Sequence, residues 1–592
     1  MTLIKNGIHS YRLNLSSTHS PFHSSMRIER ESEHVEIIHL ILESDKPAVP
    51  PVCKIEWTLP IVDIQGLWHP TASKNKGLPP VWGSTFESKS TSSAPIVSLF
   101  NAKGTNRLTM ACSDVLNVIR YHAGIHEEDS TFRCYFSFFD TPTTPISRYE
   151  AQLRIDKREI PYYDSIQDAS QWYETYEINT PIQVPSEALE PMYSSWYSFH
   201  QQFTPAAIEE QCLLARELGC KAVIVDDGWQ TSDNARGYAY CGDWEVAVDK
   251  IQDMAEHVKR VHALGLKYIL WYSVPFVGRN SNAWSRYENK LLSHNDGLRT
   301  GILDPRYPEV RNYIINTYEQ AMREWDLDGF KLDFVDSFYQ PTEENPNNDP
   351  GRDDVSVPQA VDLLLSEVIN RLQAIKPEVM IEFRQSYISP IMRKYGNMFR
   401  AADCPNDVVQ NRISTVDIRL LCGNTAVHSD MVMWNAQEPV ESAALQLINI
   451  LFSVPQISVR LDKLPPDHLA MLKSWLAFWR EHRDVLMHGR FMPHNPELMY
   501  PLIEASNESK YIAAVYMDTV VTLVSRLQSQ QIIIVNGTHT DRLIIDIVED
   551  IGKRSVAVYN CQGQQVNSQT IDGTCELLAL EVPPSGYIYF SS

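Results

Sequence analysis

Long apolar runs are missing from this chain of 592 residues. No window approaches the roughly 18 uncharged apolar residues that a membrane-spanning helix needs. The first residues, Met1-Thr-Leu-Ile-Lys-Asn-Gly, show neither the apolar core nor the small-residue cleavage pattern of a secretory signal. We therefore expect no membrane partner and no export.

Cysteine is sparse and unclustered. The ten cysteines form no C-x-x-C pair and no group with the spacing of metal ligands. The acidic run at 343–354 lacks the D-x-D-x-D-G spacing of a calcium-binding loop, so a solvated loop is expected there. These features predict reduced thiols in a cytoplasmic protein without a bound metal.

Glycine-rich phosphate-binding motifs are also absent, and positive charge is in deficit. There is no G-x-x-x-x-G-K-[ST] and no G-x-G-x-x-G, so no nucleotide cofactor is predicted. Lysine and arginine number 52 against 74 aspartates and glutamates, a net charge of -22 at pH 7. This balance argues against nucleic acid and anionic membranes as partners. A neutral substrate fits it better.

What is present is the composition of a large globular protein, in three regions of different periodicity. Residues 1–185 carry short alternating segments between turns, which predicts an antiparallel β-sandwich. Residues 186–488 alternate strands with helices, which predicts a parallel (β/α)8 TIM barrel. Alternating strands return at 489–592 and predict a small C-terminal β domain. The barrel strands are expected at 192–199, 222–229, 268–274, 328–336, 379–384, 396–403, 426–433 and 455–459.

The segment from Asp328 to Asp336 carries two charges inside a buried strand. Lys331 and Asp333 lie two residues apart and so point to the same side. Such charges are costly to bury unless they pair or serve a reaction, and a structural ion pair is the alternative to a functional role. In a parallel barrel, the carboxyl end of a strand opens onto the active-site face.

Polar and aromatic residues also end the other predicted barrel strands. Because these ends converge on one pocket, we expect the residues there to surround a substrate. Carboxylates and cations bond vicinal hydroxyls, and tryptophan faces stack on the C–H surface of a sugar, so a polyhydroxylated substrate is indicated. The predicted pocket residues besides Lys331 and Asp333 are Asp226, Asp227, Trp229, Trp271, Glu382, Arg384, Arg400 and Asp403.

Two of these carboxylates fit the needs of glycoside hydrolysis. One carboxyl must protonate the leaving oxygen, and the other must attack or activate water. Asp333 is the predicted nucleophile, because the neighbouring Lys331 favours its ionised form. Asp403, two strands further round the barrel, is the predicted acid/base. A retaining mechanism needs these carboxyls about 5–5.5 Å apart. A helix N-cap or turn aspartate is the alternative for Asp403.

Three motifs in order resemble the clan of retaining α-galactosidases: Asp226-Asp-Gly-Trp229, Lys331-Leu-Asp333 and the Asp-rich segment 403–412. Within the clan, the chain is most similar to glycoside hydrolase family 36, the melibiase-like enzymes. The resemblance is specific over 190–435 and architectural elsewhere. It implies that Asp226 and Asp227 bond galactose O4 and O6 and that Lys331 helps to bind hydroxyls. It also implies Asp333 as nucleophile, Asp403 as acid/base, and a homo-oligomer, since relatives often assemble.

Three departures separate the chain from the family pattern. The family's acid/base motif is similar to S-D-x-x-D-x-x-x-R, whereas 402–412 has one more residue in each gap, which leaves Asp407 as an alternative acid. Arg400 precedes Asp403 by three positions instead of four. The Gly-rich C-x-G-G-G-x-R segment is absent, and Glu382-Phe-Arg384-Gln-Ser-Tyr387 stands in its place. The pocket around the sugar's O2 and the aglycone can therefore differ.

We predict a metal-independent, retaining exo-glycosidase that hydrolyses a terminal α-galactoside through a glycosyl-aspartate intermediate. The alternatives within this class are an α-N-acetylgalactosaminidase, an α-glucosidase-type enzyme and a raffinose-synthase-type transglycosylase. The last is suggested by Asp226-Asp-Gly-Trp-Gln230. The alternative outside the class is a catalytically silent carbohydrate-binding protein. The joint presence of both carboxylates and the lysine argues against it.

Overall fold

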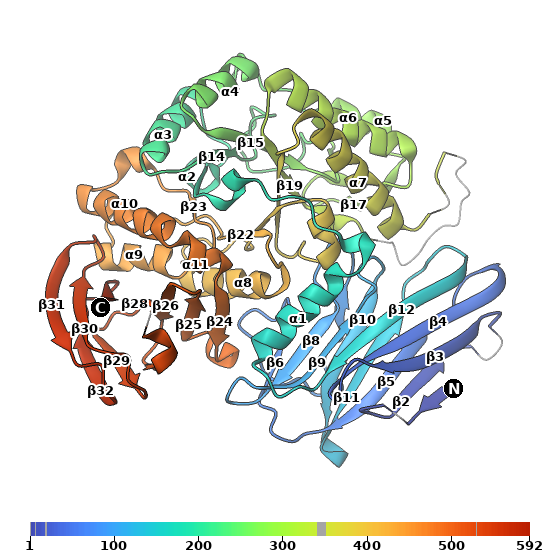
Figure 1. Ribbon diagram of the computed structural model, residues 1–592. Coiled ribbons are helices and arrows are strands. Elements are labelled where there is room, and N and C mark those ends of the chain that lie inside the picture. Colours follow the sequence, from blue (N-terminus) through green and yellow to red (C-terminus); the bar gives the residue numbers. More distant parts are fainter. Residues whose placement is uncertain are drawn as a thin grey trace.

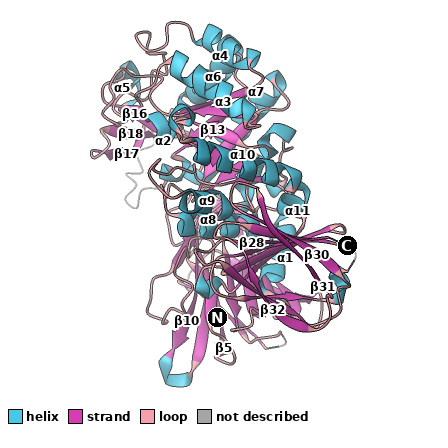
Figure 2. Cartoon of the chain, turned by 90° about the vertical axis from the view of Figure 1, so that its left-hand side faces the viewer, coloured by secondary structure: helices cyan, strands magenta, loops and turns pink. Residues whose placement is uncertain are grey.

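The computed structural model describes residues 2–5, 7–17, 20–339, 351–353, 355–528 and 530–591, so most of the acidic run at 343–354 lies outside the described residues. Figure 1 shows a barrel with an N-terminal β-rich part at its lower right and a C-terminal one at its lower left. Figure 2 shows helices gathered around the barrel and strands dominating the parts below it. The predicted fold class is confirmed. None of the described helices is both long enough and apolar enough to cross a membrane.

The N-terminal region is a sandwich of two antiparallel sheets. Along one central strand, Ile55, Trp57 and Leu59 alternate with more exposed residues, which buries one face between the sheets. The strands are β1 (Thr2–Ile4), β2 (Tyr11–Leu15), β3 (His23–Arg30), β4 (Val35–Ala48), β5 (Cys53–Pro60), β6 (Gly66–Trp68), β7 (Phe86–Ser88), β8 (Ile96–Phe100), β9 (Asn106–Cys112), β10 (Ile119–His126), β11 (Thr131–Phe138) and β12 (Ile146–Asp156). In the described part of the chain, each sheet has six strands, in the orders β1-β2-β5-β11-β10-β7 and β3-β4-β12-β9-β8-β6.

A helix that the sequence did not predict, α1 (Tyr162–Glu174), joins the sandwich to the barrel. Its buried residues Tyr162, Ile166, Ala169 and Tyr173 follow a helical period. They pack into the large core that α1 shares with β9 of the sandwich and a later barrel helix at 408–421. The two domains are therefore packed through a continuous apolar interface.

Eight parallel strands form the barrel sheet in the order β22-β21-β20-β19-β15-β14-β13-β23. Bridges between His428 and Val454 and between Val432 and Ile457 join its two ends. The strands are β13 (Met192–Ser194), β14 (Ala222–Val225), β15 (Lys267–Ser273), β19 (Gly329–Asp333), β20 (Met380–Arg384), β21 (Met398–Arg400), β22 (Ala426–His428) and β23 (Gln456–Ile457).

Helices follow most of these strands, and several of them begin after a residue whose side chain accepts a hydrogen bond from a backbone N–H of the first turn. Thr204 caps α3 by accepting a hydrogen bond from the N–H of Ala207 (3.3 Å), with proline at the first helical position. The helices are α2 (Trp196–Phe199), α3 (Pro205–Glu217), α4 (Met254–Ala263), α5 (Asn282–Tyr287), α6 (Pro308–Trp325), α7 (Val357–Ile375), α8 (Val408–Leu421), α9 (Val440–Ile448), α10 (Pro466–Glu481) and α11 (Arg483–His488).

Several barrel elements differ from the prediction. The first strand ends at Ser194, and the aromatic residues expected to continue it form α2. Helix α8 was not predicted, although the N-cap of Asp407 starts it. A small antiparallel sheet of β16 (Phe276–Gly278), β17 (Leu291–Asn295) and β18 (Thr300–Leu303) is inserted after β15.

The C-terminal region is the predicted β domain. Its strands are β24 (Arg490–His494), β25 (Leu502–Ser506), β26 (Lys510–Val515), β27 (Val520–Leu523), β28 (Gln531–Asn536), β29 (Arg542–Ile547), β30 (Arg554–Tyr559), β31 (Gln565–Ile571), β32 (Glu576–Glu581) and β33 (Tyr587–Ser591). Among the residues described, seven of them form one sheet, and β27, β29 and β32 form another. Apolar residues between the sheets, such as Ile532 and Ile545, form a separate core.

One buried carboxylate ties the three regions together. Asp417 of α8 accepts hydrogen bonds from Trp68 Nε1 (2.8 Å) and Lys76 Nζ (2.7 Å) of the sandwich. It also accepts one from Tyr500 Oη (2.5 Å) of the C-terminal region. Buried charges are tolerated when they are paired and hydrogen-bonded in this way. The barrel helix that follows Asp403 is therefore fixed from both sides.

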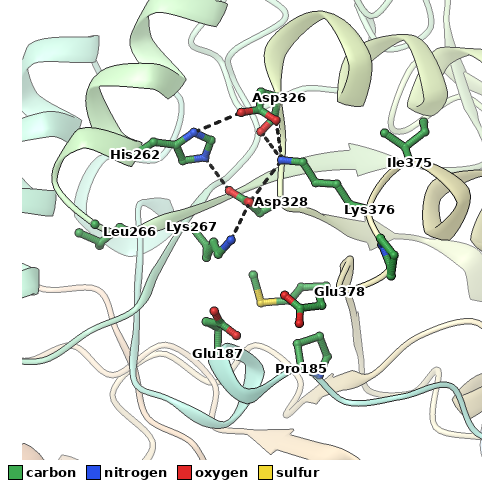
Figure 3. Close-up of a pocket in the computed structure, with 13 residues that line it drawn as sticks. Pro185, Glu187, His262, Leu266, Lys267, Asp326, Asp328, Ile375, Lys376 and Glu378 are labelled. Atoms are coloured by element: carbon green, nitrogen blue, oxygen red, sulfur yellow. Dashed lines mark hydrogen bonds and ion pairs between the residues drawn. The ribbon is translucent and has the colours of Figure 1, made fainter.

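A second buried carboxylate, Asp328, closes the amino-terminal end of the barrel beside a cavity of about 650 Å³. It accepts hydrogen bonds from His262 Nε2 (2.7 Å), the N–H of Tyr268 (2.9 Å), Lys267 Nζ (3.3 Å) and Lys376 Nζ (3.3 Å). Figure 3 shows the side chains of His262, Lys267 and Lys376 around this carboxylate. Burial alone would raise the pKa of Asp328, but the hydrogen bonds from His262 and the N–H of Tyr268, together with the charges of Lys376 and His262, lower it to about 2. In (β/α)8 barrels, residues at the amino-terminal ends of the strands contribute to stability, whereas the active site lies at the carboxyl-terminal ends.

Replacing Asp328 with asparagine is expected to lower the free energy of unfolding at pH 7 by about 2 kcal/mol. The carboxyl pKa is about 2 in the folded protein and about 4 when unfolded, so its stabilisation is complete above pH 4 and is lost as the pH falls toward 2. Thermal unfolding at pH 7, 5 and 3 should show that the difference in stability between wild type and Asp328→Asn becomes smaller as the pH falls. Asp326→Asn, at a side chain that is 71% exposed, is the matched control. If Asp328→Asn and wild type are equally stable at pH 7, the ionised carboxylate of Asp328 does not stabilise the fold.

Candidate active site

The carboxylate of Asp333, at the end of β19, is held by four donors. Arg384 Nε (2.8 Å), Tyr387 Oη (2.6 Å) and the N–H of Phe334 (2.8 Å) donate to Oδ1. Trp271 Nε1 donates to Oδ2 at 3.2 Å. Oδ1 therefore accepts three of the four hydrogen bonds. Oδ2 accepts only one, so its lone pairs are freer to form a new bond.

The environment of Asp333 keeps it ionised. Burial by itself would raise its pKa. The charges of Arg384 and Lys331, together with the hydrogen bonds from Tyr387 and Trp271, outweigh burial and hold the pKa well below its ordinary range. A carboxylate nucleophile has to be in this state.

Lys331 of β19 lies close to the end of β14. Its Nζ donates to Asp226 Oδ2 at 2.5 Å, in an ion pair of two side chains that are each at most 5% exposed. The partner of the lysine is thus Asp226, and Lys331 acts on Asp333 through its charge. The predicted grouping of all three residues at one end of the barrel holds.

Asp227 follows Asp226 and is fixed by two amides. Gln201 Nε2 (2.6 Å) and Gln230 Nε2 (2.7 Å) donate to its two oxygens. Burial, aided by the charge of Asp226, raises the pKa of Asp227 to about 7 against the opposing hydrogen bonds. Asp227 can therefore change its protonation near neutral pH, either donating to or accepting from a hydroxyl.

Arg400, the last residue of β21, is shared by three carboxylates. It donates to Asp430 Oδ1 (2.5 Å) and to Asp403 Oδ1 (2.8 Å), and its Nε lies 3.4 Å from Glu382 Oε1. Gln456 donates to the other oxygen of Glu382. Asp430 and Glu382 lie behind the guanidinium, with 0% exposed side chains, whereas that of Asp403 is 48% exposed. Of the three, Asp403 is the one that faces solvent.

The charge of Asp403 is coupled to that of Asp333. Partial burial would raise the pKa of Asp403, but Arg400, Lys331 and Arg384 lower it, while the negative charge of Asp333 opposes them. Two of these cations, Lys331 and Arg384, also lower the pKa of Asp333. The two predicted catalytic carboxylates thus belong to one electrostatic unit.

Asp407 has a different environment. Its side chain caps α8 by accepting from the N–H of Gln410 (2.9 Å), and it pairs with Lys74 Nζ (2.7 Å) of the sandwich. Arg412, which ends the same motif, donates to the carbonyl of Met499 in the C-terminal region (2.9 Å). The helix N-cap, which was the alternative role for Asp403, is therefore the role of Asp407, four residues further along the chain.

Most residues predicted to contact substrate are buried in this structure, and for Trp229, Trp271 and Glu382 the protein partners indicate a supporting role. Trp229 and Glu382 are 0% exposed, and Trp271 is 1% exposed. Trp229 Nε1 donates to the carbonyl of Trp271 (2.9 Å), and the ring of Trp271 stacks on Tyr238 at 6.1 Å. In this arrangement, the two tryptophans support Asp333, and Glu382 supports Arg400.

Three tyrosines near these carboxylates were not predicted. Tyr387 donates to Asp333, and Tyr197 Oη donates to Asp430 Oδ2 (3.0 Å). Tyr238 packs edge-on to Phe334, and burial together with nearby carboxylates raises its pKa. Tyr387 stands in the segment that replaces the family's Gly-rich motif. This departure from the family pattern is the one sequence signal that indicated a difference near Tyr387.

The arrangement combines an ionised, well-held carboxylate with an exposed second carboxylate next to a cation. Such a pair can attack a carbon centre and exchange a proton with the departing oxygen. The neighbouring Asp226, Asp227 and Lys331 provide hydrogen-bond acceptors and donors of the kind that bind sugar hydroxyls. The geometry therefore suits substitution at an anomeric carbon.

The residues of the candidate site all lie in the region of the chain that matches a known protein family. A family model described as Melibiase matches residues 187–489. α-Galactosidase 1 from Pediococcus pentosaceus is 27% identical over 149 residues, covering 24% of this chain and 20% of that protein. The sequence alignments with such curated relatives thus span about a fifth of their length.

Solved structures share the architecture. The α-galactosidase from Lactobacillus brevis superposes with a TM-score of 0.64 and 14% identity, covering 98% of this chain and 85% of that one. A variant of the GH36 α-galactosidase AgaA from Geobacillus stearothermophilus, in complex with raffinose, gives a TM-score of 0.61 and 16% identity, covering 84% and 76%. At these identities, the likeness shows the fold alone.

Proposed function

We propose that this chain, which belongs to the Melibiase family, hydrolyses terminal α-galactosides with retention of the anomeric configuration. The observation that carries the proposal is the pair of coupled carboxylates, Asp333 and Asp403, of which one is buried and ionised and the other is exposed beside Arg400. The names of the relatives and the raffinose complex of AgaA support the choice of a galactoside.

In the first half-reaction, Asp333 Oδ2 would attack the anomeric carbon. This oxygen has one donor at 3.2 Å, from Trp271, whereas Oδ1 is occupied by Arg384, Tyr387 and the N–H of Phe334. The bond from the anomeric carbon to the leaving oxygen breaks as the bond to Oδ2 forms. Asp403 donates its proton to that oxygen, which gives a covalent glycosyl-aspartate.

In the second half-reaction, Asp403 would take a proton from water, whose oxygen attacks the anomeric carbon and releases Asp333. The Arg400 contact favours the ionised form of Asp403, which is the form that accepts a proton. The two displacements on opposite faces of the sugar return the original configuration.

Substrate binding would fall mainly to the end of β14. Asp226 and Asp227 are the proposed acceptors for two hydroxyls on the far side of the ring, and Lys331 is paired with Asp226. Arg384 is held against Asp333, so we assign it to holding the nucleophile instead of the sugar. Arg400, Trp229, Trp271 and Glu382 would support the site from behind.

Cytoplasmic location and assembly into a homo-oligomer are further proposals. The first is supported by the ten cysteines, all of which are free thiols, nine of them buried. The second is supported by the family resemblance alone. Light scattering of the purified chain tests the second, and a mass equal to one chain would contradict it.

Hydrolysis of a panel of p-nitrophenyl α-glycosides tests the proposed substrate. We expect kcat/KM to be at least about tenfold higher for the α-galactoside than for the N-acetylgalactosaminide and the glucoside, because one mispositioned hydroxyl or added group costs about this much or more. Preference for another glycoside would keep the mechanism and reject the substrate. Binding of galactose without any turnover would favour a silent carbohydrate-binding protein.

A further inference from the structure

The segment Ser88–Ser93 of the N-terminal sandwich is polar and yet buried. Five of its residues are at most 8% exposed: Ser88, Lys89, Ser90, Thr91 and Ser93. Reciprocal hydrogen bonds between the main chains of Lys89 and Ser92, both 3.0 Å, close it into a tight turn. Lysine in particular is seldom buried unless its ammonium group is bonded. The partners of this turn therefore indicate its role.

Lys89 reaches from the sandwich to the chain that follows Asp333. Its Nζ donates to the carbonyls of Asp336 (2.6 Å) and Phe338 (3.1 Å) and lies 4.7 Å from the ring centre of Tyr339. Burial lowers the pKa of Lys89 to about 8, although nearby carboxylates oppose this shift. The cation thus binds main-chain oxygens three and five residues beyond the proposed nucleophile.

The other end of the same turn holds the chain that follows β20. Ser93 donates its N–H to the carbonyl of Ser386 (2.9 Å), and the hydroxyls of Ser92 and Ser386 are 3.0 Å apart. Ser386 stands between Arg384 and Tyr387, the two side chains that donate to Asp333 Oδ1. One turn therefore contacts both segments that determine how the carboxylate is held.

We propose that the Ser88–Ser93 turn is a positioning element that sets the orientation of Asp333 from the neighbouring domain. The inference rests on the proposed function, because it assigns Asp333 as the nucleophile. Lys89 acts through the 334–338 segment, and Ser92 and Ser93 act through Ser386. The sandwich thus takes part in holding the catalytic carboxylate, and its contribution goes beyond packing against the barrel. Misplacement of a reacting group by about 1 Å costs on the order of 100-fold in rate.

Kinetics of Lys89→Met test this role. We expect kcat to fall about 30-fold with KM changed less than twofold, because the sugar-binding residues of β14 are not touched. Lys89→Arg, which keeps the charge and the donors, should recover most of kcat, and Ser92→Ala should lower it a few-fold. Lys74→Met is the control, because Lys74 also joins the sandwich to the barrel but contacts Asp407. Its kcat should stay within twofold of wild type.

Hydrogen exchange provides a readout that does not depend on turnover. In Lys89→Met, amides in peptides covering 334–339 and 384–389 should exchange at least about fivefold faster, whereas in Lys74→Met they should not. If these peptides are unchanged, or if Lys89→Met retains wild-type kcat, the inference is overturned. If the exchange changes as expected but the wild type hydrolyses no α-glycoside, the turn still holds these segments and the proposed function fails instead.

Discussion

Replacing Asp333 with alanine is expected to lower kcat for p-nitrophenyl α-galactoside by about 10⁴-fold or more. The variant lacks the oxygen that would form the glycosyl-enzyme, and removal of a catalytic nucleophile has effects of this order. Arg384, Tyr387 and Trp271 would lose their shared acceptor, so thermal unfolding has to confirm that the variant is folded. Asp333→Asn, of the same shape, is the second variant for this purpose.

Added azide gives this prediction a stereochemical readout. In Asp333→Ala, a small anion can occupy the place of the carboxylate and attack the anomeric carbon once, which yields the β-galactosyl azide. Asp336→Asn is the matched control, because Asp336 is a nearby carboxylate in the segment just beyond β19. It should retain at least about a third of wild-type kcat. If Asp333→Ala turns over nearly as fast as wild type, or if only Asp336→Asn loses turnover, Asp333 is not the nucleophile.

Replacing Asp403 with alanine is expected to lower kcat/KM by about 10²–10⁴-fold for a galactoside with a poor leaving group, such as raffinose. The loss should be much smaller for a p-nitrophenyl galactoside, whose leaving group needs little protonation. Azide should accelerate release of the intermediate and give the α-galactosyl azide, because it then attacks the glycosyl-enzyme from the opposite face. The anomer of the azide product thus distinguishes Asp403→Ala from Asp333→Ala.

Asp407→Ala is the counterpart of Asp403→Ala. This change removes the N-cap of α8 and the ion pair with Lys74, so we expect a loss of about 1 kcal/mol in stability with kcat/KM within about threefold of wild type. If Asp407→Ala shows the leaving-group dependence and Asp403→Ala does not, the acid/base assignment is reversed.

The pH dependence of kcat/KM follows from the same two carboxylates. The first half-reaction needs Asp403 protonated and Asp333 ionised. The pKa of Asp403 is lowered from its ordinary value, and the pKa of Asp333 lies well below the usual range. The protonated fraction of Asp403 therefore rises as the pH falls, while Asp333 stays ionised. Because Asp227, with a pKa of about 7, also gains a proton over this range, the profile is recorded in Asp227→Asn. We expect kcat/KM of this variant to increase from pH 7 to pH 5, and a constant value over this range would contradict the assignment.

The barrel was predictable because its strands are buried apolar runs with charged residues at one end. The run from Ala222 to Val225 before Asp226 and the alternation around Lys331 carry this signal in the local sequence. The strand at Met398–Arg400 is shorter than expected, because its ends are determined by pairing with β20 and β22. Helix α8 was not predicted, because it begins at Asp407, which caps it, and the motif around Asp407 indicated a catalytic acid instead of a helix N-cap.

The site was predictable in its charged members but not in their partners. Asp333, Lys331 and Asp403 stand in motifs, whereas the bond of Lys331 to Asp226 joins residues 105 positions apart. Glu382 looked like a ligand for substrate, yet packing places it behind Arg400, where it is fully buried. Lys89 could not have been found from the sequence, because its contacts with the carbonyls beyond Asp333 exist only once two domains have docked.

The central claim is that hydrolysis proceeds by two displacements at the anomeric carbon, with Asp333 as the first nucleophile. Proton NMR of the first product formed from p-nitrophenyl α-galactoside, recorded before mutarotation, tests it most directly. The account predicts that α-galactose appears first and converts slowly to the β-anomer. If β-galactose appears first, water attacks the substrate directly, and the glycosyl-aspartate is excluded.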